Sequence, residues 1–175
     1  SDRDLRKTEL QNSNAQVQQK GGDWVAGPTP LAGLSKEERG KYLGLKEAKD
    51  LRALKFNFRG PDRFLPKSLD WRERDGVVRK VDDQGQCGSC WAFAAMEVLE
   101  SQAMIKGMGE LDLSEQYLVS CDPFDYGCNG GHLAWTKKFL LEKGAVDEKC
   151  FPYSASDSVP CHRRAARTPA KRPAE

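Results

Sequence analysis

All six cysteines of this 175-residue chain fall between positions 87 and 161, and the first 86 residues contain none. They lie among glycines, prolines and aromatic residues, a pattern typical of disulfide-bonded segments in oxidising or endolysosomal compartments. Scattered buried thiols of a cytosolic protein are the alternative interpretation. The sequence therefore predicts covalent cross-links in the second half of the chain only. The cysteines are Cys87, Cys90, Cys121, Cys128, Cys150 and Cys161.

The composition excludes several classes of protein. With 38% hydrophobic and 31% charged residues, the chain is typical of a globular protein. A net charge of +2 is too small and too evenly spread to favour nucleic-acid binding. There is no run of about 18 apolar residues, so we predict no membrane partner. Because the chain begins with Ser1, we expect a processed or partial product without its signal peptide.

Residues 1–64 and 162–175 differ in texture from the segment between them. Residues 1–20 are polar and predict at most a thin helix. Ser35 and Glu38 have the spacing of a capping box, which predicts a helix that continues through Tyr42, Leu43 and Leu45. A domain boundary is expected near residues 64–65, where apolar density begins to rise. The tail 162–175 has five Lys and Arg, one Glu and no large apolar residue, so we expect disorder there.

Residues 65–161 predict one short strand and three helices. Val77–Val81 fits the strand. A helix over 90–106 is apolar around nearly its whole circumference, so we expect it to be buried, with Ser89 as its cap. The other helices are expected from Ser114 onward and over about 132–143.

The stretch Gln84–Phe93 contains the candidate catalytic residues. A glycine-containing loop leads into the buried helix, and Cys90 falls in its first turn. The unpaired N–H groups and the dipole of a helix start favour negative charge, which predicts a nucleophilic thiolate at Cys90. Gln84 could place a side-chain N–H₂ beside the Cys90 N–H, and two such donors form an oxyanion hole. Gly85 and Gly88 would let a peptide backbone approach closely.

This stretch resembles the active-site signature of the papain-like cysteine proteases. Further stretches resemble the same family in the same order: the start of the mature enzyme at 65–72, the second helix at 114–121, the substrate loop at 126–131 and Phe151-Pro152-Tyr153. Residues 23–27 and 40–44 look like a short propeptide of the cathepsin B type. In such zymogens the propeptide crosses the cleft backwards and blocks it.

The resemblance implies a role for each matched residue. Cys90 would be the nucleophile and Gln84 the oxyanion donor. Cys87 would pair with Cys128 and Cys121 with Cys161, which leaves Cys150 an orphan. His132 would lie on the wall of the pocket for the second residue before the scissile bond; an ordinary polar residue at a helix start is the other interpretation. The implied substrate-binding residues are Gly88, Ser89, Trp91, Asn129, Gly130, Gly131 and His132.

The implied fold class is α+β, a papain-like fold truncated to its helical left domain, with the β-rich right domain missing. Family members need a histidine and an orienting asparagine about 130–150 residues after the cysteine. His132 and His162, the two histidines here, match neither position. The resemblance therefore implies a cysteine peptidase present as a zymogen-like fragment, 1–64 being its propeptide and 65–161 its helical half. We expect a lysosomal, endosomal or extracellular location, peptide or protein substrates, and the propeptide as an intramolecular inhibitor.

Three alternatives remain at this stage. The chain could be an inactive truncated paralogue that acts as a binding or inhibitory decoy. Cys87 and Cys90 form a Cys-x-x-Cys pair that would suit a thiol–disulfide redox module, although no βαβ pattern precedes it. A zinc site built from these cysteines with Cys121 and Cys128 has an unsuitable spacing in its second pair. No metal and no cofactor is therefore predicted.

Overall fold

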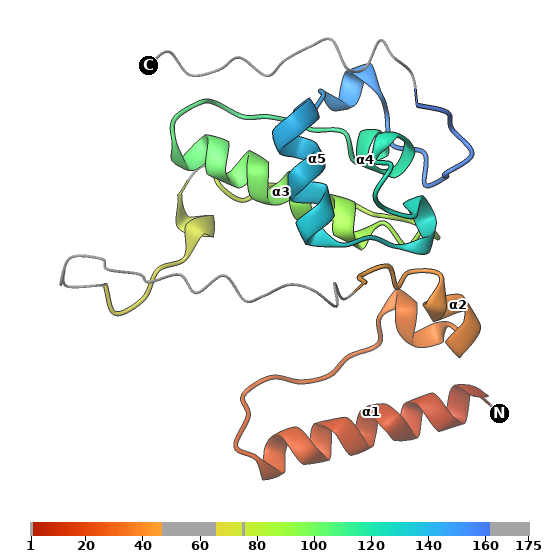
Figure 1. Cartoon of the computed structure of the whole chain (residues 1–175). Coiled ribbons are helices and arrows are strands. Elements are labelled where there is room, and N and C mark those ends of the chain that lie inside the picture. The colour runs from red at the N-terminus through yellow and green to blue at the C-terminus, as the bar shows by residue number, and fades with distance from the viewer. Residues whose placement is uncertain (1, 47–65, 75, 162–175) are drawn as a thin grey trace. The chain divides into compact units, whose positions relative to one another are not determined.

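The computed structural model describes residues 2–46, 66–74 and 76–161. The predicted boundary at 64–65 and the basic tail 162–175 lie outside the described residues. Within the described ranges the chain forms five α-helices, short 3-10 helices and two isolated β-bridges, but no strand. The α-helices are α1 (Asp2–Gln19), α2 (Lys36–Gly40), α3 (Cys90–Ile105), α4 (Glu115–Cys121) and α5 (Leu133–Lys143) (Figure 1).

The chain divides into two compact units, Ser1–Gly40 and Lys41–Glu175. In the first unit α1 is an 18-residue helix, and it covers most of the stretch 1–20 where the sequence predicts at most a thin helix. Asn14 holds it to the following segment, because its side-chain amide exchanges hydrogen bonds of 3.0 and 2.6 Å with the backbone of Ala26. Val17 of this helix is buried.

The capping box at α2 is confirmed, but the helix is shorter than predicted. The Ser35 N–H donates to Glu38 Oε2 at 2.7 Å, and the Glu38 N–H donates to Ser35 Oγ at 3.2 Å. The helix ends at Gly40. Tyr42, Leu43 and Leu45, predicted to continue the helix, instead belong to a non-helical segment of the second unit.

In the second unit, α3 packs against both α4 and α5 (Figure 1). Ser114 caps α4 as predicted, because its Oγ accepts the Tyr117 N–H at 3.0 Å. Gly144 follows α5 with φ of 77°, a left-handed backbone that favours glycine. The core joins the buried faces of these helices to the segments after α5 and consists of Trp91, Ala92, Met96, Leu113, Tyr117, Leu118, Val119, Phe139, Val146 and Phe151.

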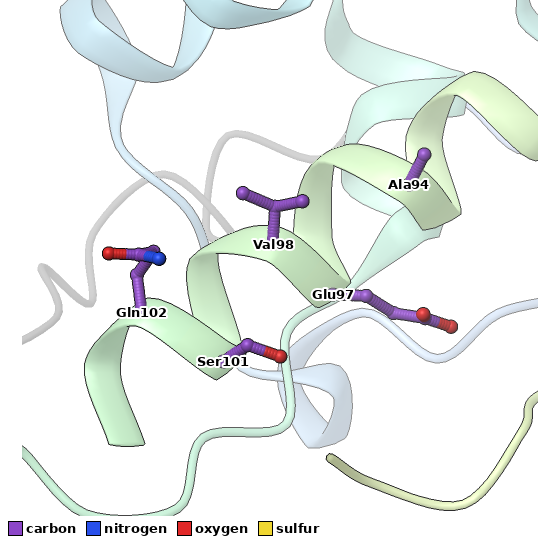
Figure 2. A pocket seen from close by; sticks show the side chains of 5 residues that line it. All are labelled: Ala94, Glu97, Val98, Ser101 and Gln102. Carbon is purple, nitrogen blue, oxygen red and sulfur yellow. The ribbon is translucent and has the colours of Figure 1, made fainter. Parts of the chain in front are cut away.

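Helix α3 is buried on one side only, so the prediction of burial around its whole circumference is wrong. Val98 is 61% exposed, and Leu99 and Ile105 are also exposed. Figure 2 shows part of this open side, where five residues line a shallow hollow: Ala94, Glu97, Val98, Ser101 and Gln102. Apolar density in a sequence does not tell which side of a helix the rest of the fold covers.

The predicted strand at Val77–Val81 is also wrong. This stretch forms a turn and an irregular segment. Arg79 turns inward, where its guanidinium lies 3.0 Å from both Glu100 Oε1 and Asp112 Oδ1 and donates to the Leu111 carbonyl at 3.0 Å. Side-chain bonds to α3 and to the loop after it, rather than a β-ladder, therefore fix this segment.

None of the helices in the described ranges is long and apolar enough to cross a membrane.

Candidate active site

The free thiol of Cys90 is half-buried at the first residue of α3. The loop before it is anchored by the Cys87–Cys128 disulfide and by a 2.9 Å hydrogen bond from the Gly88 N–H to the Cys128 carbonyl. The first residues of a helix carry N–H groups without intrahelical partners, which favour negative charge nearby. The anchored loop therefore holds the thiol at the N-terminal end of α3, beside the backbone N–H groups of its first turn.

Two cross-links join the segments around the site. Besides Cys87–Cys128, a disulfide links Cys121 at the end of α4 to Cys161. These are the pairs that the family resemblance implies. Cys150 is free and exposed. Because Cys87 is bonded to Cys128, the redox pair Cys87–Cys90 does not form, and a zinc site that needs both Cys87 and Cys128 as ligands is excluded. Among the described residues, no group of three or more His, Cys, Asp or Glu could hold a metal ion.

The side chain of Gln84 bridges the active-site loop and the segment 41–46. Its Nε2 donates to the Cys87 carbonyl at 2.8 Å and to the Tyr42 carbonyl at 2.9 Å. One N–H of the Gln84 amide is bonded to the Cys87 carbonyl of its own loop, which fixes the orientation of the amide. The other N–H, which the sequence assigns to an oxyanion, is bonded to the Tyr42 carbonyl.

Gly131 binds the same segment through both of its backbone groups. Its N–H donates to the Gly44 carbonyl and its carbonyl accepts the Lys46 N–H, each at 2.8 Å. The two bonds flank Leu45, which is the pattern of a parallel pair. An antiparallel peptide would exchange both bonds with a single residue, so segment 41–46 runs in the opposite direction to a peptide paired in that way.

Close backbone contact requires the glycines at this crossing. A Cβ on Gly44 would overlap the Gly88 carbonyl, and a Cβ on Gly131 would overlap the indole of Trp91. Trp91 is itself buried, and its Nε1 donates to the Gly127 carbonyl at 3.2 Å. Gly44 can therefore lie this close to Gly88, and Gly131 this close to Trp91, only because neither glycine has a side chain.

His132 lies next to Gly131 and is held by a buried carboxylate. Asp125 Oδ1 accepts the His132 N–H at 2.8 Å and lies 3.0 Å from His132 Nδ1. Thr136 Oγ1 donates to Asp125 Oδ2 at 3.2 Å, and the Asp125 side chain has no exposed surface. Burial raises the pKa of the neighbouring Asp122 to about 6, with a smaller contribution from the Asp125 carboxylate. The Nδ1 side of the His132 ring therefore faces the Asp125 carboxylate.

Three further predicted residues, Asn129, Gly130 and Ser89, lie at the ends of helices. Asn129 ends the 3-10 helix Gly127–Asn129, and Gly130 follows it with φ of 109°. Ser89 is fully buried and precedes α3, but its side chain does not cap the helix as predicted. Its hydroxyl lies 2.6 Å from the Tyr153 hydroxyl instead.

Sequence reasoning missed the contributions of Tyr153 and Asp125 to the site. It expected residues 40–44 to be part of a propeptide that blocks the cleft, but it predicted the segment 41–46 as helix. Tyr153 was recognised only as part of a family landmark, and its hydroxyl donates to the Gln84 carbonyl at 2.7 Å across 69 residues of sequence. Asp125 gave a weak signal, as an acid within the substrate loop. Gly44 was the available signal for the segment, since glycine permits close backbone approach.

Comparison with known proteins agrees with this geometry. Residues 65–173 match the family described as papain family cysteine protease. The chain belongs to this family. It is 43% identical over 137 residues to the probable cysteine protease RD21B of Arabidopsis thaliana, covering 75% of this chain and 29% of that protein. It is 46% identical over 104 residues to procathepsin L of Rattus norvegicus, covering 58% of this chain and 30% of that protein. The chain thus spans less than a third of these relatives.

Solved structures show the same fold and correct the type of propeptide. The structure of digestive procathepsin L2 from Tenebrio molitor matches 95% of this chain and 56% of that chain, with a TM-score of 0.82 and 27% identity. The expectation of a cathepsin B-like propeptide is wrong, because the match to a cathepsin L-type proenzyme runs through nearly the whole chain. The α1 helix, over a stretch where the sequence predicts at most a thin helix, lies within the N-terminal part of the chain that this match covers almost completely. The papain-like fold is confirmed, and the described part is its helical portion.

Proposed function

We propose that this protein is a cysteine-type peptidase whose active site is held in a zymogen form. The observation that carries the proposal is the backbone of segment 41–46 bound to Gln84 and Gly131, with Gly44 against Gly88 two residues before the free Cys90. A site that binds an extended backbone next to a nucleophile suits peptide-bond cleavage. Membership of the papain family supports the same chemistry.

In the proposed reaction, the Cys90 thiolate attacks the carbonyl carbon of a peptide bond. The carbonyl oxygen becomes an oxyanion that the Gln84 side-chain N–H and the Cys90 N–H stabilise. Collapse of the tetrahedral intermediate breaks the C–N bond, and the leaving amine takes a proton from a general acid. The acyl-enzyme is then hydrolysed by water, which releases the carboxylic acid and restores the thiolate. Gly131 would hold the substrate backbone, with Gly88, Ser89, Trp91, Asn129, Gly130 and His132 around it.

The general acid and base would be a histidine other than His132 and His162, since neither matches the family position for this group. We therefore propose that the 175 residues alone hydrolyse peptides at a negligible rate. The reversed direction of segment 41–46 supports an inhibitory role for residues 1–64, because a peptide bound that way offers its carbonyls in a non-productive order. Peptide substrates and a lysosomal, vacuolar or extracellular location follow from the similarity to cathepsin L and plant proteases.

A binding or inhibitory decoy is the second candidate function. It is favoured by the same pairing of Gly131 with a peptide backbone, which needs no catalytic histidine. The decoy would bind extended peptides without cleaving them.

Labelling of Cys90 tests the proposed peptidase site. After removal of residues 1–46, a peptidyl epoxide should alkylate Cys90 at least about tenfold faster than the exposed thiol of Cys150, because the backbone of the probe binds Gly131. Cys90→Ser is the control that removes the signal. Equal labelling of the two thiols would contradict a peptide-directed nucleophile at residue 90.

A fluorogenic dipeptidyl substrate tests whether the chain alone is active. The processed chain should show no turnover above that of Cys90→Ser. Turnover at ordinary protease rates that is lost in Cys90→Ser would overturn the proposal that neither His132 nor His162 serves as the base.

A further inference from the structure

The hydroxyl of Tyr153 lies between two parts of the proposed active site. It is 2.7 Å from the backbone carbonyl of Gln84 and 2.6 Å from Ser89 Oγ. Gln84 carries the proposed oxyanion donor, and Ser89 directly precedes Cys90. The phenol ring is fixed by an edge-on contact with Phe93 of α3 at 4.9 Å, and the Tyr153 N–H donates to Glu148 Oε1 at 2.6 Å. A single side chain thus bridges the two sides of the loop that leads to Cys90.

The direction of the protons in this bridge follows from the groups involved. A backbone carbonyl accepts only, so the one proton of the Tyr153 hydroxyl is donated to Gln84. The 2.6 Å contact with Ser89 therefore requires that Ser89 donates to Tyr153. Ser89 has a single hydroxyl proton too, and its alternative acceptor, the Cys87 carbonyl, lies at a longer 3.4 Å.

This use of Ser89 is unusual for its place in the fold. Serine directly before a helix usually accepts an N–H of the first turn with its hydroxyl. Here the Ser89 side chain makes no such cap, and its backbone carbonyl instead accepts the Ala92 and Phe93 N–H groups at 2.8 and 3.2 Å. In the part of the chain that the structure describes, the Cys90 N–H has no hydrogen-bond acceptor. The start of α3 thus keeps unneutralised donors beside the thiol.

We propose that Tyr153 is a positioning residue for the oxyanion site. Its hydroxyl fixes the backbone of Gln84 and draws the Ser89 hydroxyl away from the first turn of α3, which leaves the donors there open to negative charge. The catalytic meaning of this role rests on the proposed function, but the positioning itself is a property of the folded chain. Tyr153 touches neither the thiol nor the proposed reacting atoms.

Removal of one hydroxyl group tests the proposal on the 175-residue chain. In a Cys150→Ser background Cys90 is the only free thiol, and its reaction with iodoacetamide can be followed against pH. Tyr153→Phe should slow this reaction by about threefold to tenfold, the range expected for the loss or gain of one hydrogen bond. The Gln84 side-chain and Cys90 backbone amide signals should also shift in ¹H–¹⁵N spectra. Tyr117→Phe, in the buried tyrosine that packs on Phe139, is the matched control and should change neither.

Ser89→Ala separates the two halves of the proposal. With no hydroxyl to cap α3, the addition of Tyr153→Phe should still move the Gln84 signals but leave those of Cys90 and Trp91 in place. Circular dichroism checks that each variant is folded. If Tyr153→Phe and Tyr117→Phe change the alkylation rate equally, or if the Gln84 signals stay fixed, the positioning role is overturned. These readouts need no peptide hydrolysis, so failure of the proposed peptidase activity would leave them unaffected and distinguishable.

Discussion

Asp125 fixes a side chain and a stretch of backbone at once. Its buried carboxylate accepts hydrogen bonds from the His132 backbone N–H and the Thr136 hydroxyl. The oxygen that accepts the N–H also contacts His132 Nδ1. The bonded N–H belongs to the residue after Gly131, so the position of the backbone that binds segment 41–46 depends on this carboxylate. A single side chain with no exposed surface therefore supports the backbone of the proposed peptide site.

Two substitutions of Asp125 should distinguish the contribution of its hydrogen-bond acceptors from that of its negative charge. Asp125→Ala leaves the His132 N–H unpaired, whereas the Thr136 hydroxyl can still donate to the His132 carbonyl at 3.0 Å, so the free energy of unfolding should fall by about 1–3 kcal/mol. Asp125→Asn keeps the Oδ1 acceptor, and its amide can donate to the Thr136 hydroxyl, so most of that loss should be recovered. Urea denaturation of the three proteins measures the difference. Equal destabilisation by Ala and Asn would mean that the negative charge, rather than the acceptor geometry, holds the loop.

At the scale of elements, the local signals in the sequence were sufficient and the non-local ones were not. The capping box of Ser35 and Glu38 and the cap at Ser114 were predicted because each involves residues three apart. The strand at 77–81 was wrong because Arg79 bonds to Glu100 and Asp112, and no local pattern reveals such partners. The exposed side of α3 was missed because an apolar residue reads the same whether or not the fold covers it.

The same contrast between local and non-local signals applies to the residues of the candidate active site. Cys90 and Gln84 could be identified from one contiguous motif, and Gly131 from the substrate loop. The bonds that position them could not, because Gln84 reaches Tyr42 across 42 residues and Tyr153 across 69. The segment 41–46 was predicted as helix because its apolar residues follow a good cap, yet pairing with Gly131 outweighs a helical preference already weakened by Gly40 and Gly44.

The segment 41–46 should be released by one added side chain. Gly44→Val places a Cβ against the Gly88 carbonyl, so the segment must move and its bonds to Gly131 and Gln84 should be lost. We expect alkylation of Cys90 by a peptidyl epoxide to accelerate by about tenfold or more, since each lost hydrogen bond is worth roughly a factor of 2–12. Gly40→Ala is the control, because a Cβ there meets no atom within 4 Å. An unchanged rate in Gly44→Val would show that the segment does not restrict the site.

At the scale of the whole molecule, buried acids set the dependence of stability on pH. Burial raises the pKa of Glu115 to about 8, with smaller contributions from the charges of Glu148, Glu100 and Asp82. Burial also raises the pKa of Asp122 to about 6. Since both side chains are nearly inaccessible to water, their ionised forms are disfavoured in the folded chain relative to the unfolded chain.

The sign of the effect follows from proton binding. Between the unfolded value near 4 and the folded values of about 6 and 8, the folded chain holds more protons than the unfolded chain. Stability should therefore be highest in acid and should fall as the pH rises from about 4 to about 8, by an amount on the order of 2–5 kcal/mol for Glu115. An acidic compartment would favour the folded form, in agreement with the proposed lysosomal or vacuolar location.

Urea denaturation at several pH values tests this dependence. For the chain that carries both Cys90→Ser and Cys150→Ser, which avoids thiol exchange at high pH, the free energy of unfolding should decrease steadily from pH 5 to pH 8. Glu115→Gln should flatten most of this decrease because the variant has no proton to lose, whereas Glu97→Gln, at an exposed position on α3, should leave it unchanged. A stability that rises toward pH 8, or an equal slope in Glu115→Gln, would mean that water or a rearranged side chain solvates the Glu115 carboxylate. The buried acid would then not be the group that links folding to pH.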